Sequence, residues 1–395
     1  MEFILFDDET RQSLLPLTYT RPVAEIRIGI LRIREKWERY LEGNYSYLTE
    51  SFLKIKFQFK PGKENIFING SVLPSASLVK EIQNLKSGEK LIKDEVLIAA
   101  RMDSNLSGIE SMEQIEFSNS LDCKSTFIKI NFSWDIFSKN EEALIDDFRL
   151  ITKGRKSCQI SSNNTVISPE NVFLEEGAKV ECAILNASTG FIYIGKGAEI
   201  MEGSMIRGPF ALCEGSHVKM GAKIYGATTV GPYSKVGGEI SNSVILGYTN
   251  KAHDGFLGNS VLGEWCNLGA DSNNSNLKNN YSKIKVWNYK EGNYINTGLQ
   301  FCGLIMGDHS KCSINTMFNT GTVVGVSANI FGNGFPPKFI PSFAWGGSEG
   351  FITYRLEDAL DVAQRVYERR HLNFSAVEKD ILRNLFDNST KYRAW

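Results

Sequence analysis

Residues 194–237 read IGKGAEIMEGSMIRGPFALCEGSHVKMGAKIYGATTVGPYSKVG, and an aliphatic side chain returns at every sixth position of this stretch. These aliphatic positions are Ile194, Ile200, Ile206, Leu212, Val218, Ile224, Val230 and Val236. Small residues, glycine above all, lie between them. An α-helix has a period of 3.6 residues, which cannot produce a period of six.

A period of six predicts a left-handed parallel β-helix of hexapeptide repeats. Each side of such a triangular coil is a short strand with one inward aliphatic residue, followed by a tight turn in which glycine is favoured. Stacked coils bury a continuous aliphatic ladder, and each coil contacts only its neighbours. We therefore expect a solenoid over residues 165–345.

The period of six is interrupted twice. Residues 237–255, GGEISNSVILGYTNKAHDG, depart from it before it resumes at Leu257, and residues 271–300 form an irregular stretch rich in Asn, Ser and Tyr. The period then continues from Met306 to Ile330. Interruptions of this kind are typical of loops that project from a solenoid.

The regions on either side of the solenoid have other patterns. Residues 1–160 predict an α/β, Rossmann-like domain, with strands at 3–6 and 66–68 and helices over 22–41 and 78–85. Alternating strands and helices favour a mostly parallel sheet with its ligand site at the carboxyl ends of the strands. Residues 350–395 predict two helices that cover the open end of the solenoid, and the second has a Ser375–Glu378 capping box.

Composition argues against several classes of partner. The 44 Lys plus Arg and 45 Asp plus Glu residues give no electrostatic reason to expect nucleic acid or an anionic membrane. The apolar run at the N-terminus is too short and too acidic for a signal peptide. The seven cysteines have no C-x-x-C spacing, so neither a disulfide framework nor a zinc site is indicated. We expect a cytoplasmic protein without a membrane partner.

Residues 6–38, FDDETRQSLLPLTYTRPVAEIRIGILRIREKWE, resemble the start of sugar nucleotidyltransferase-like proteins that join such a domain to a β-helix. In typical members the first strand leads into a Gly-rich loop that ends in Thr-Arg and holds the triphosphate. Here LLPLTYTRP, residues 14–22, takes that place. The resemblance therefore implies that Arg11 and Arg21 bind phosphate through charge-assisted bonds.

A second departure concerns magnesium. The family strand that ends in Gly-Asp supplies a carboxylate to Mg²⁺, whereas this sequence has Asn69-Gly70. Three other carboxylates are candidates to replace the missing aspartate as a magnesium ligand: Asp7, Asp8 and Asp135. The implied nucleotide site comprises Asp7, Asp8, Arg11, Arg21, Asn69 and Gly70. Nucleotidyl transfer from an NTP with Mg²⁺ and a reduced role in binding or scaffolding both stay open, as does an ion pair of Arg21 with Glu25 or Glu38.

Residues 253–270, HDGFLGNSVLGEWCNLGA, resemble the acetyltransferase domain of the GlmU-like family of bifunctional N-acetylglucosamine-1-phosphate uridylyltransferase and glucosamine-1-phosphate acetyltransferase proteins. That family has His-x-x-Tyr-Leu-Gly followed by Asn-Ile-Gly-Ala-Gly. The resemblance implies that His253 is the general base of acyl transfer. An ordinary imidazole, with a pKa near 6.5, is largely neutral at cellular pH and accepts a proton.

The same resemblance implies the substrates and the assembly. Asn250, Lys251 and Asn267 would orient a sugar phosphate or nucleotide sugar, and Phe256 replaces the family tyrosine that touches the sugar. The acyl donor would be acyl-CoA, acetyl-CoA above all, bound between the subunits of a homotrimer. The leading hypothesis is thus an acyltransferase of sugar-nucleotide metabolism. The alternative is a non-catalytic sugar-nucleotide-binding or regulatory protein that uses the β-helix as a trimer scaffold.

Overall fold

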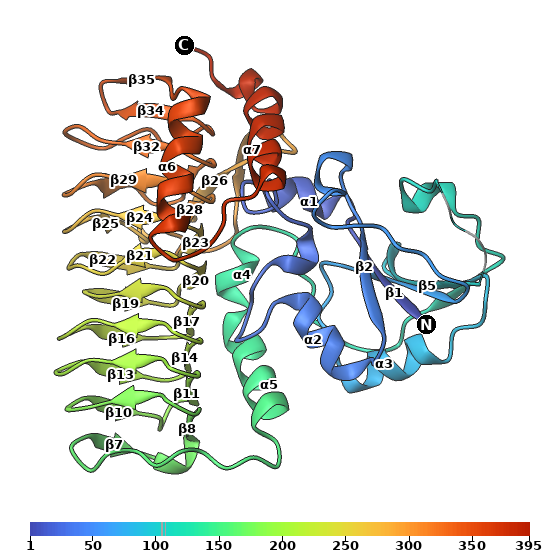
Figure 1. Cartoon of the computed structure of the whole chain (residues 1–395), viewed down its shortest axis with the longest axis horizontal. Coiled ribbons are helices and arrows are strands. Elements are labelled where there is room, and N and C mark those ends of the chain that lie inside the picture. The colour runs from blue at the N-terminus through green and yellow to red at the C-terminus, as the bar shows by residue number, and fades with distance from the viewer. Residues whose placement is uncertain (104–105, 107) are drawn as a thin grey trace.

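The computed structural model describes residues 1–103, 106 and 108–395. A tall stack of parallel coils stands beside a smaller α/β domain, and two C-terminal helices lie near the upper part of the stack (Figure 1). Residues that are far apart in the sequence therefore meet along the boundary between these parts. The fold class predicted from the sequence, a nucleotidyltransferase-like domain joined to a left-handed β-helix, is confirmed.

The N-terminal domain contains one mixed sheet with the strand order β2-β1-β3-β5-β4-β6. Its strands are β1 (Glu2–Phe6), β2 (Asn44–Leu48), β3 (Asn65–Asn69), β4 (Glu89–Lys93), β5 (Val96–Met102) and β6 (Asn119–Asp122). β1 pairs in parallel with β2 and β3, but β5 is antiparallel to β3 and β4. Because β4 and β6 also pair in parallel, three of the five pairings are parallel, as expected from the sequence. The antiparallel pairing of β4 and β5 comes from a tight hairpin built by the positive φ of Asp94 and Glu95.

The helical segments of this domain are short. They are α1 (Thr10–Ser13), η1 (Val23–Glu25), α2 (Ile33–Tyr40), η2 (Ser51–Leu53), α3 (Ala76–Gln83), η3 (Met112–Gln114), α4 (Asp135–Ser138) and α5 (Asn140–Thr152). The prediction at 78–85 matches α3, but the helix predicted over 22–41 is wrong in its first half. The Gly29 amide donates to Asn140 (2.7 Å) and the Ile30 amide to Asp147 (2.7 Å), so tertiary contacts replace helical hydrogen bonds there.

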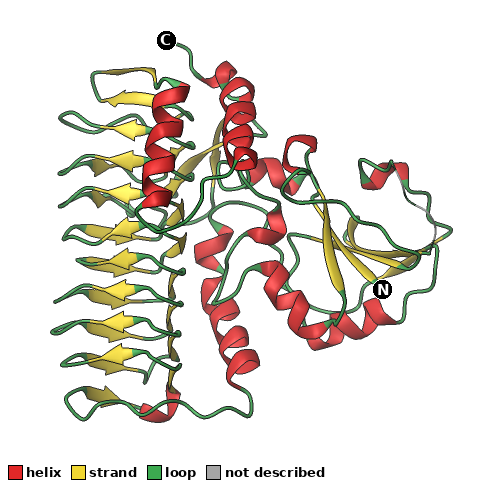
Figure 2. Ribbon diagram, viewed as in Figure 1, coloured by secondary structure: helices red, strands yellow, loops and turns green. Residues whose placement is uncertain are grey.

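The β-helix has three faces (Figure 2). The first face is formed by β7 (Thr165–Ile167), β10 (Ile184–Asn186), β13 (Met205–Arg207), β16 (Lys223–Tyr225), β19 (Glu239–Ser241) and β22 (Phe256–Gly258). The second face is formed by β8 (Val172–Leu174), β11 (Ile192–Ile194), β14 (Phe210–Leu212), β17 (Thr228–Val230), β20 (Val244–Gly247), β23 (Val261–Glu264), β28 (Leu304–Met306), β31 (Thr322–Val324) and β33 (Phe339–Ile340). The third face is formed by β9 (Lys179–Val180), β12 (Glu199–Ile200), β15 (His217–Val218), β18 (Lys235–Val236), β21 (Asn250–Lys251), β24 (Asn267–Leu268), β29 (Lys311–Cys312), β32 (Asn329–Ile330), β34 (Ala344–Gly347) and β35 (Gly350–Thr353).

The first interruption of the period is not a projecting loop. Ile206 pairs with Ile224, 18 positions later, whereas Val236 pairs with Lys251, only 15 positions later. The chain has shortened its turns there and kept the stack continuous, which corrects the expectation from the sequence. As a result Lys251 takes the inward position of its strand, where the ladder elsewhere holds aliphatic residues such as Val236.

The second interruption does leave the coil. β25 (Asn273–Asn274) pairs with β30 (Met317–Phe318), and between them β26 (Lys285–Asn288) and β27 (Asn293–Asn296) form an antiparallel hairpin. The hairpin reaches the N-terminal domain, because Lys290 lies 2.7 Å from Glu9 and the Tyr289 ring packs edge-on against Tyr19. The projecting loop expected over residues 271–300 therefore also joins the two domains.

The C-terminal helices α6 (Leu356–Glu368) and α7 (Ala376–Asn388), followed by η5 (Thr390–Tyr392), run along the stack rather than across its end (Figure 1). The expected cap over the open end is therefore wrong, and the antiparallel strand β35 finishes the last coil. The capping box of α7 is present, with Ser375 accepting from the Glu378 amide and Glu378 accepting from the Ser375 amide. No helix of the described residues has the length and apolar character needed to cross a membrane.

The second face carries the N-terminal domain, and the first face is open. Val244, Leu246 and Val261 belong to the same buried cluster as the core of the N-terminal domain. The Phe148 ring of α5 stacks on Phe191 with ring centroids 4.2 Å apart. By contrast, the first face exposes several large apolar side chains. These are Ile167, Ile184, Met205 and Tyr225.

Candidate functional site

Asp7 lies at the carboxyl end of β1, where the sequence places a nucleotide site. Its carboxylate is buried and accepts from the Arg11 guanidinium (2.9 Å), the Thr49 hydroxyl (2.5 Å) and the Val23 amide (2.8 Å). Burial raises the pKa of Asp7, and the charge of Arg11 opposes that rise. The carboxylate is thus fully engaged by the protein.

Asp8 is closer to the surface and is bonded to one other predicted residue, Asn69. It accepts from Asn69 Nδ2 (2.9 Å) and the Thr10 amide (3.0 Å), and it pairs with Lys129 (3.3 Å). Burial alone would raise the pKa of Asp8, but Lys129, Asn69 and Thr10 together lower it. The amide of Gly70 donates to the Phe6 carbonyl, which closes the end of the sheet.

Arg11 holds the segment that replaces the Gly-rich loop. Nη1 donates to Asp7 and to the Arg21 carbonyl (2.9 Å each), and Nη2 donates to the Thr18 carbonyl. The Thr18 hydroxyl donates back to the Arg11 carbonyl (2.8 Å). Arg11, which the resemblance predicted to bind phosphate, therefore fixes residues 11–21 against the core through these hydrogen bonds.

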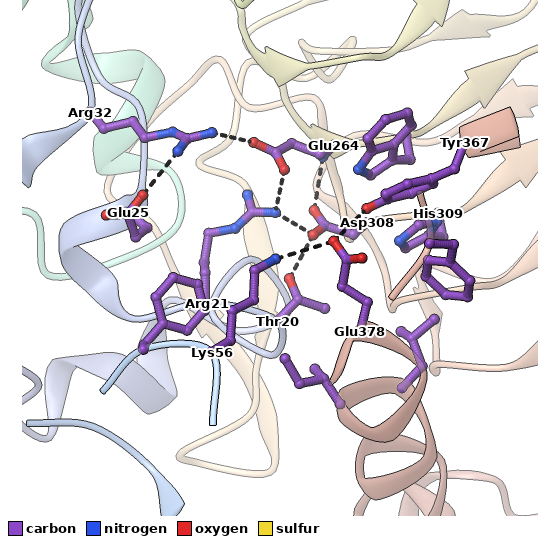
Figure 3. A pocket seen from close by; sticks show the side chains of 15 residues that line it. Thr20, Arg21, Glu25, Arg32, Lys56, Glu264, Asp308, His309, Tyr367 and Glu378 are labelled. Atoms are coloured by element: carbon purple, nitrogen blue, oxygen red, sulfur yellow. Dashed lines mark hydrogen bonds and ion pairs between the residues drawn. The ribbon is translucent and has the colours of Figure 1, made fainter. Parts of the chain in front are cut away.

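Arg21 points away from Asp7 and toward the β-helix. Its Nη2 pairs with Asp308 and lies 3.3 Å from Glu264, on two coils of the solenoid (Figure 3). Arg32 bridges Glu264 (3.1 Å) and Glu25 (3.0 Å). Arg21 therefore does form an ion pair, but its partners are Asp308 and Glu264 of the β-helix and not Glu25 or Glu38, the partners named in the alternative.

These carboxylates do not form a donor set suited to magnesium. Asp7 and Asp8 accept hydrogen bonds from residues of their own domain, and Asp135 accepts from the amides of Asn131 (2.7 Å) and Phe132 (3.2 Å). Within residues 1–103, 106 and 108–395, no group of three or more His, Cys, Asp or Glu side chains has the arrangement of a metal site. The carboxylates at this end of the sheet therefore do not fit a magnesium ion.

The second set of predicted residues meets at one corner of the β-helix. His253 lies in the turn between β21 on the third face and β22 on the first face, with its side chain exposed. Gly255 makes the turn, because its φ of +108° disfavours a side chain and the Ser272 carbonyl occupies the space that a Cβ would need. The turn thus presents the imidazole to solvent from a fixed backbone.

Lys251 lies directly beneath this turn. Its side chain is buried inside the coil, and Nζ donates to the carbonyl oxygens of His253 (2.6 Å) and Asp254 (3.1 Å). Burial lowers the pKa of Lys251 to about 8, against the opposing charges of Asp254 and Asp271. The amine therefore supports the turn from inside, whereas the sequence suggested that it contacts a sugar.

The remaining predicted residues flank the corner. Asn250 and Asn267 pair in register on the third face, and Asn250 Nδ2 donates to Asn267 Oδ1 (2.9 Å). Phe256 lies on the first face, and its amide donates to Asn273 (2.7 Å). Asn250, Asn267 and Phe256 are thus half-exposed residues of β21, β24 and β22, and β21 and β22 flank the turn that carries His253.

Sequence reasoning missed a further group of polar residues between the domains. Arg21 and Asp308 are 287 positions apart, and neither lies in a local motif that announces the pair. Tyr367 and Glu378 of the C-terminal helices complete the same neighbourhood (Figure 3). Only the packing of three separate regions brings these side chains together.

Comparisons with known proteins agree with the resemblance seen in the sequence. Residues 3–156 match the family described as sugar nucleotidyl transferase. A bifunctional sugar-1-phosphate nucleotidylyltransferase/acetyltransferase of Sulfurisphaera tokodaii is 26% identical over 263 residues, which is 66% of this chain and 59% of that protein. The bifunctional protein GlmU of Methanocaldococcus jannaschii is 33% identical over 87 residues, 22% of this chain and 21% of that protein. The chain thus spans about three-fifths or less of these relatives.

Among solved structures, the polySia-specific acetyltransferase NeuO covers 53% of this chain and 99% of its own, with 15% identity and a TM-score of 0.28. The UDP-N-acetylglucosamine acyltransferase from Campylobacter jejuni covers 57% of this chain and 95% of its own, with 13% identity and a TM-score of 0.23.

Proposed function

Because residues 3–156 match the sugar nucleotidyl transferase family and the β-helix presents an accessible histidine, we propose that this chain is a transferase of sugar-nucleotide metabolism. It moves an acyl group from acyl-CoA to a sugar phosphate or nucleotide sugar, with His253 as general base. The observation that carries the proposal is the turn at residues 252–255, where an exposed imidazole stands on a backbone held by buried Lys251.

The chemistry requires one proton acceptor. The neutral imidazole takes a proton from the acceptor amine or hydroxyl as its nitrogen or oxygen attacks the thioester carbonyl. The tetrahedral intermediate then collapses, the carbon–sulfur bond breaks, and the imidazolium returns the proton to the departing thiolate. Asn250 and Asn267, on the third face beside the turn, would orient the acceptor.

The open first face supports a homotrimer, in which acyl-CoA lies between neighbouring subunits. Its exposed side chains include Ile184 (43% exposed) and Met205 (45%), whereas the N-terminal domain covers the second face. Exposed apolar patches of this kind mark interaction surfaces, and a triangular prism suits closed three-fold symmetry. The corner of His253 borders this face through β22.

The trimer proposal is tested by substitution on that face. Met205→Arg places a charge in the proposed interface and should convert the trimer to a monomer in light scattering coupled to gel filtration. Met220→Arg is the matched control, because Met220 is 70% exposed at a corner next to the first face. A monomeric wild-type protein would overturn the assembly, as would an unchanged mass for Met205→Arg.

Acyl transfer is tested by measuring free coenzyme A with acetyl-CoA and a panel of amino sugar phosphates and nucleotide sugars. Detection should be chromatographic, since Cys158 and Cys182 are exposed thiols that react with colorimetric reagents. His253→Ala should lower the rate about 10²–10⁴-fold. His217→Ala, on the third face and paired with Glu199, should keep the wild-type rate. Equal rates for His253→Ala and wild type would exclude His253 from the mechanism.

For the N-terminal domain the internal pairing of Asp7, Arg11 and Arg21 favours a reduced role over nucleotidyl transfer. Incubation with sugar 1-phosphates, each NTP and Mg²⁺ should therefore release no pyrophosphate. Pyrophosphate release that Asp8→Asn abolishes would show an active nucleotidyltransferase instead. Failure of both assays would favour the second candidate, a non-catalytic sugar-nucleotide-binding or regulatory protein.

A further inference from the structure

A cavity of about 110 Å³ lies where the N-terminal domain, the β-helix and the C-terminal helices meet (Figure 3). The N-terminal domain contributes Arg21, Arg32 and Lys56 to its wall. The β-helix contributes Glu264, Trp265, Asp308 and His309, and the C-terminal helices with their connecting loop contribute Tyr367, Phe374 and Glu378. Glu264 and Trp265 lie between the second and third faces, so this site is at a different corner from His253.

Two buried polar atoms of this wall lack a hydrogen-bond partner among the described residues. They are Nη1 of Arg21 and Nδ1 of His309, and the two residues are only 5% and 8% exposed. Leaving a buried polar atom without a partner is energetically costly, so such atoms are rare in native proteins. Both side chains line the same cavity, which suggests that a ligand completes their hydrogen bonds.

The charges around the cavity favour a neutral ligand. Glu25, Glu264, Asp308 and Glu378 face Arg21, Arg32 and Lys56, so the wall has no excess of positive charge. Burial lowers the pKa of His309 to about 3, which leaves the imidazole neutral. An anion such as a phosphate would lie among four carboxyl groups, and a cation would leave Arg21 Nη1 without an acceptor.

The volume of the cavity and the aromatic part of its wall narrow the class of ligand further. At 10–15 Å³ for each water, the volume corresponds to roughly eight waters, which is the scale of one monosaccharide and below that of a nucleotide. Trp265 stacks on Tyr367 with ring centroids 4.0 Å apart, and Phe374 lies 5.0 Å from Tyr367. Aromatic rings provide an apolar surface for the C–H groups of a sugar ring.

From this geometry we infer that the cavity is a second binding site, for a neutral monosaccharide, separate from the proposed acyl-transfer corner. Ligand oxygens accept from Arg21 Nη1 and bond to the His309 imidazole, while the ring lies against the aromatic wall. Lys56, whose side chain is 42% exposed and pairs with Glu378 (3.4 Å), stands at the rim. A ligand here contacts all three regions and so stabilises their relative arrangement.

The test is calorimetric titration of the full chain with the neutral sugars N-acetylglucosamine and glucose, with glucosamine 1-phosphate as the charged comparison. Arg21→Lys keeps a cation beside Asp308 but removes Nη1. His309→Asn removes the imidazole and suits the positive φ of +62°. Arg155→Lys is the matched control, because Arg155 forms its bidentate pair with Glu175 far along the stack.

At least one neutral sugar should bind, and both cavity variants should weaken its binding about tenfold or more, while Arg155→Lys and His253→Ala bind as wild type does. If Arg21→Lys does not fold, His309→Asn decides. Three results would overturn the inference. One is no binding of any neutral sugar at about 10 mM. Another is wild-type affinity in His309→Asn. The third is binding that His253→Ala abolishes, which would place the sugar at the acyl-transfer corner and leave the proposed function intact.

Discussion

The end of the N-terminal sheet and the corner of the β-helix at His253 both carry residues predicted to be functional, and the structure treats them in opposite ways. Asp7 and Arg11 are buried, and their side chains are bonded to protein atoms. His253 is exposed, and Lys251 supports its backbone from inside the coil. A side chain whose polar atoms are engaged by the protein must first break those bonds before it can hold a substrate.

The difference also explains what replaced the Gly-rich loop. Leu14 and Leu17 are buried in the core of the N-terminal domain, and the Arg11 guanidinium fixes the carbonyls of residues 18 and 21. Buried leucines and carbonyls bonded to Arg11 therefore hold this segment against the core of the domain. The segment at the end of this sheet instead binds the β-helix, through the ion pair of Arg21 with Asp308.

The largest effect expected is that of Arg11→Met. Removing one partner of a buried ion pair leaves an unpaired charge, at a cost of about 3–5 kcal/mol in the free energy of unfolding. Urea denaturation should show this loss, and the double variant Arg11→Met/Asp7→Asn should recover part of it. If Arg11 is instead a phosphate ligand, the single variant will keep its stability and lose nucleotide binding, and the contrast between the two regions will be broken.

The next effect concerns Lys251 and its dependence on pH. Its pKa of about 8 in the folded protein lies below the ordinary 10.5. Between these two values the unfolded state binds more protons than the folded state, so raising the pH stabilises the fold. Below pH 8 both states hold the proton, and burial of the cation is a penalty. At about 1.36 kcal/mol for each pKa unit, the whole window is worth about 3 kcal/mol.

Lys251→Met is the variant that reveals this effect, because methionine suits an inward position of the ladder. The stability of the wild type relative to Lys251→Met should rise by about 2–3 kcal/mol between pH 7.5 and pH 10. Urea denaturation at the two pH values measures it, and all other titrating groups are common to both proteins. The same variant should lower the acyl-transfer rate about tenfold, since the turn under His253 loses its support. A constant difference in stability would show that the amine is not desolvated.

The sequence was sufficient for the β-helix because its period is local. Each coil repeats the aliphatic position of the coil below, so residues 194–236 predict their own pairing. The same regularity failed at Lys251, since the coil is three residues shorter there and the ladder position could not be assigned by counting. His253 could be predicted as a site residue because its motif is continuous in the sequence.

The junction between the domains was beyond such reasoning. The segment from Ile26 to Ile30 has helical spacing, but contacts with Asn140 and Asp147 hold it in a non-helical turn against the second face. Arg21 finds Asp308 from a distance of 287 residues in the sequence. An ion pair of this kind depends on how the folded N-terminal domain packs against the β-helix, and no periodic pattern in the sequence predicts that packing.

The smallest effect expected is at α7, the helix that lies between the N-terminal domain and the β-helix. The first turn of α7 supplies Glu378, which pairs with Lys56 of the N-terminal domain and accepts from Tyr367, beside the stacked Trp265 of the β-helix. Ser375→Ala removes the cap of this turn and should lower stability by about 1 kcal/mol. Hydrogen exchange should become faster in α7 and leave the coil around His253 unchanged. If protection from exchange falls equally at that coil, α7 and the coil around His253 unfold as one unit, and the two are not independent in stability.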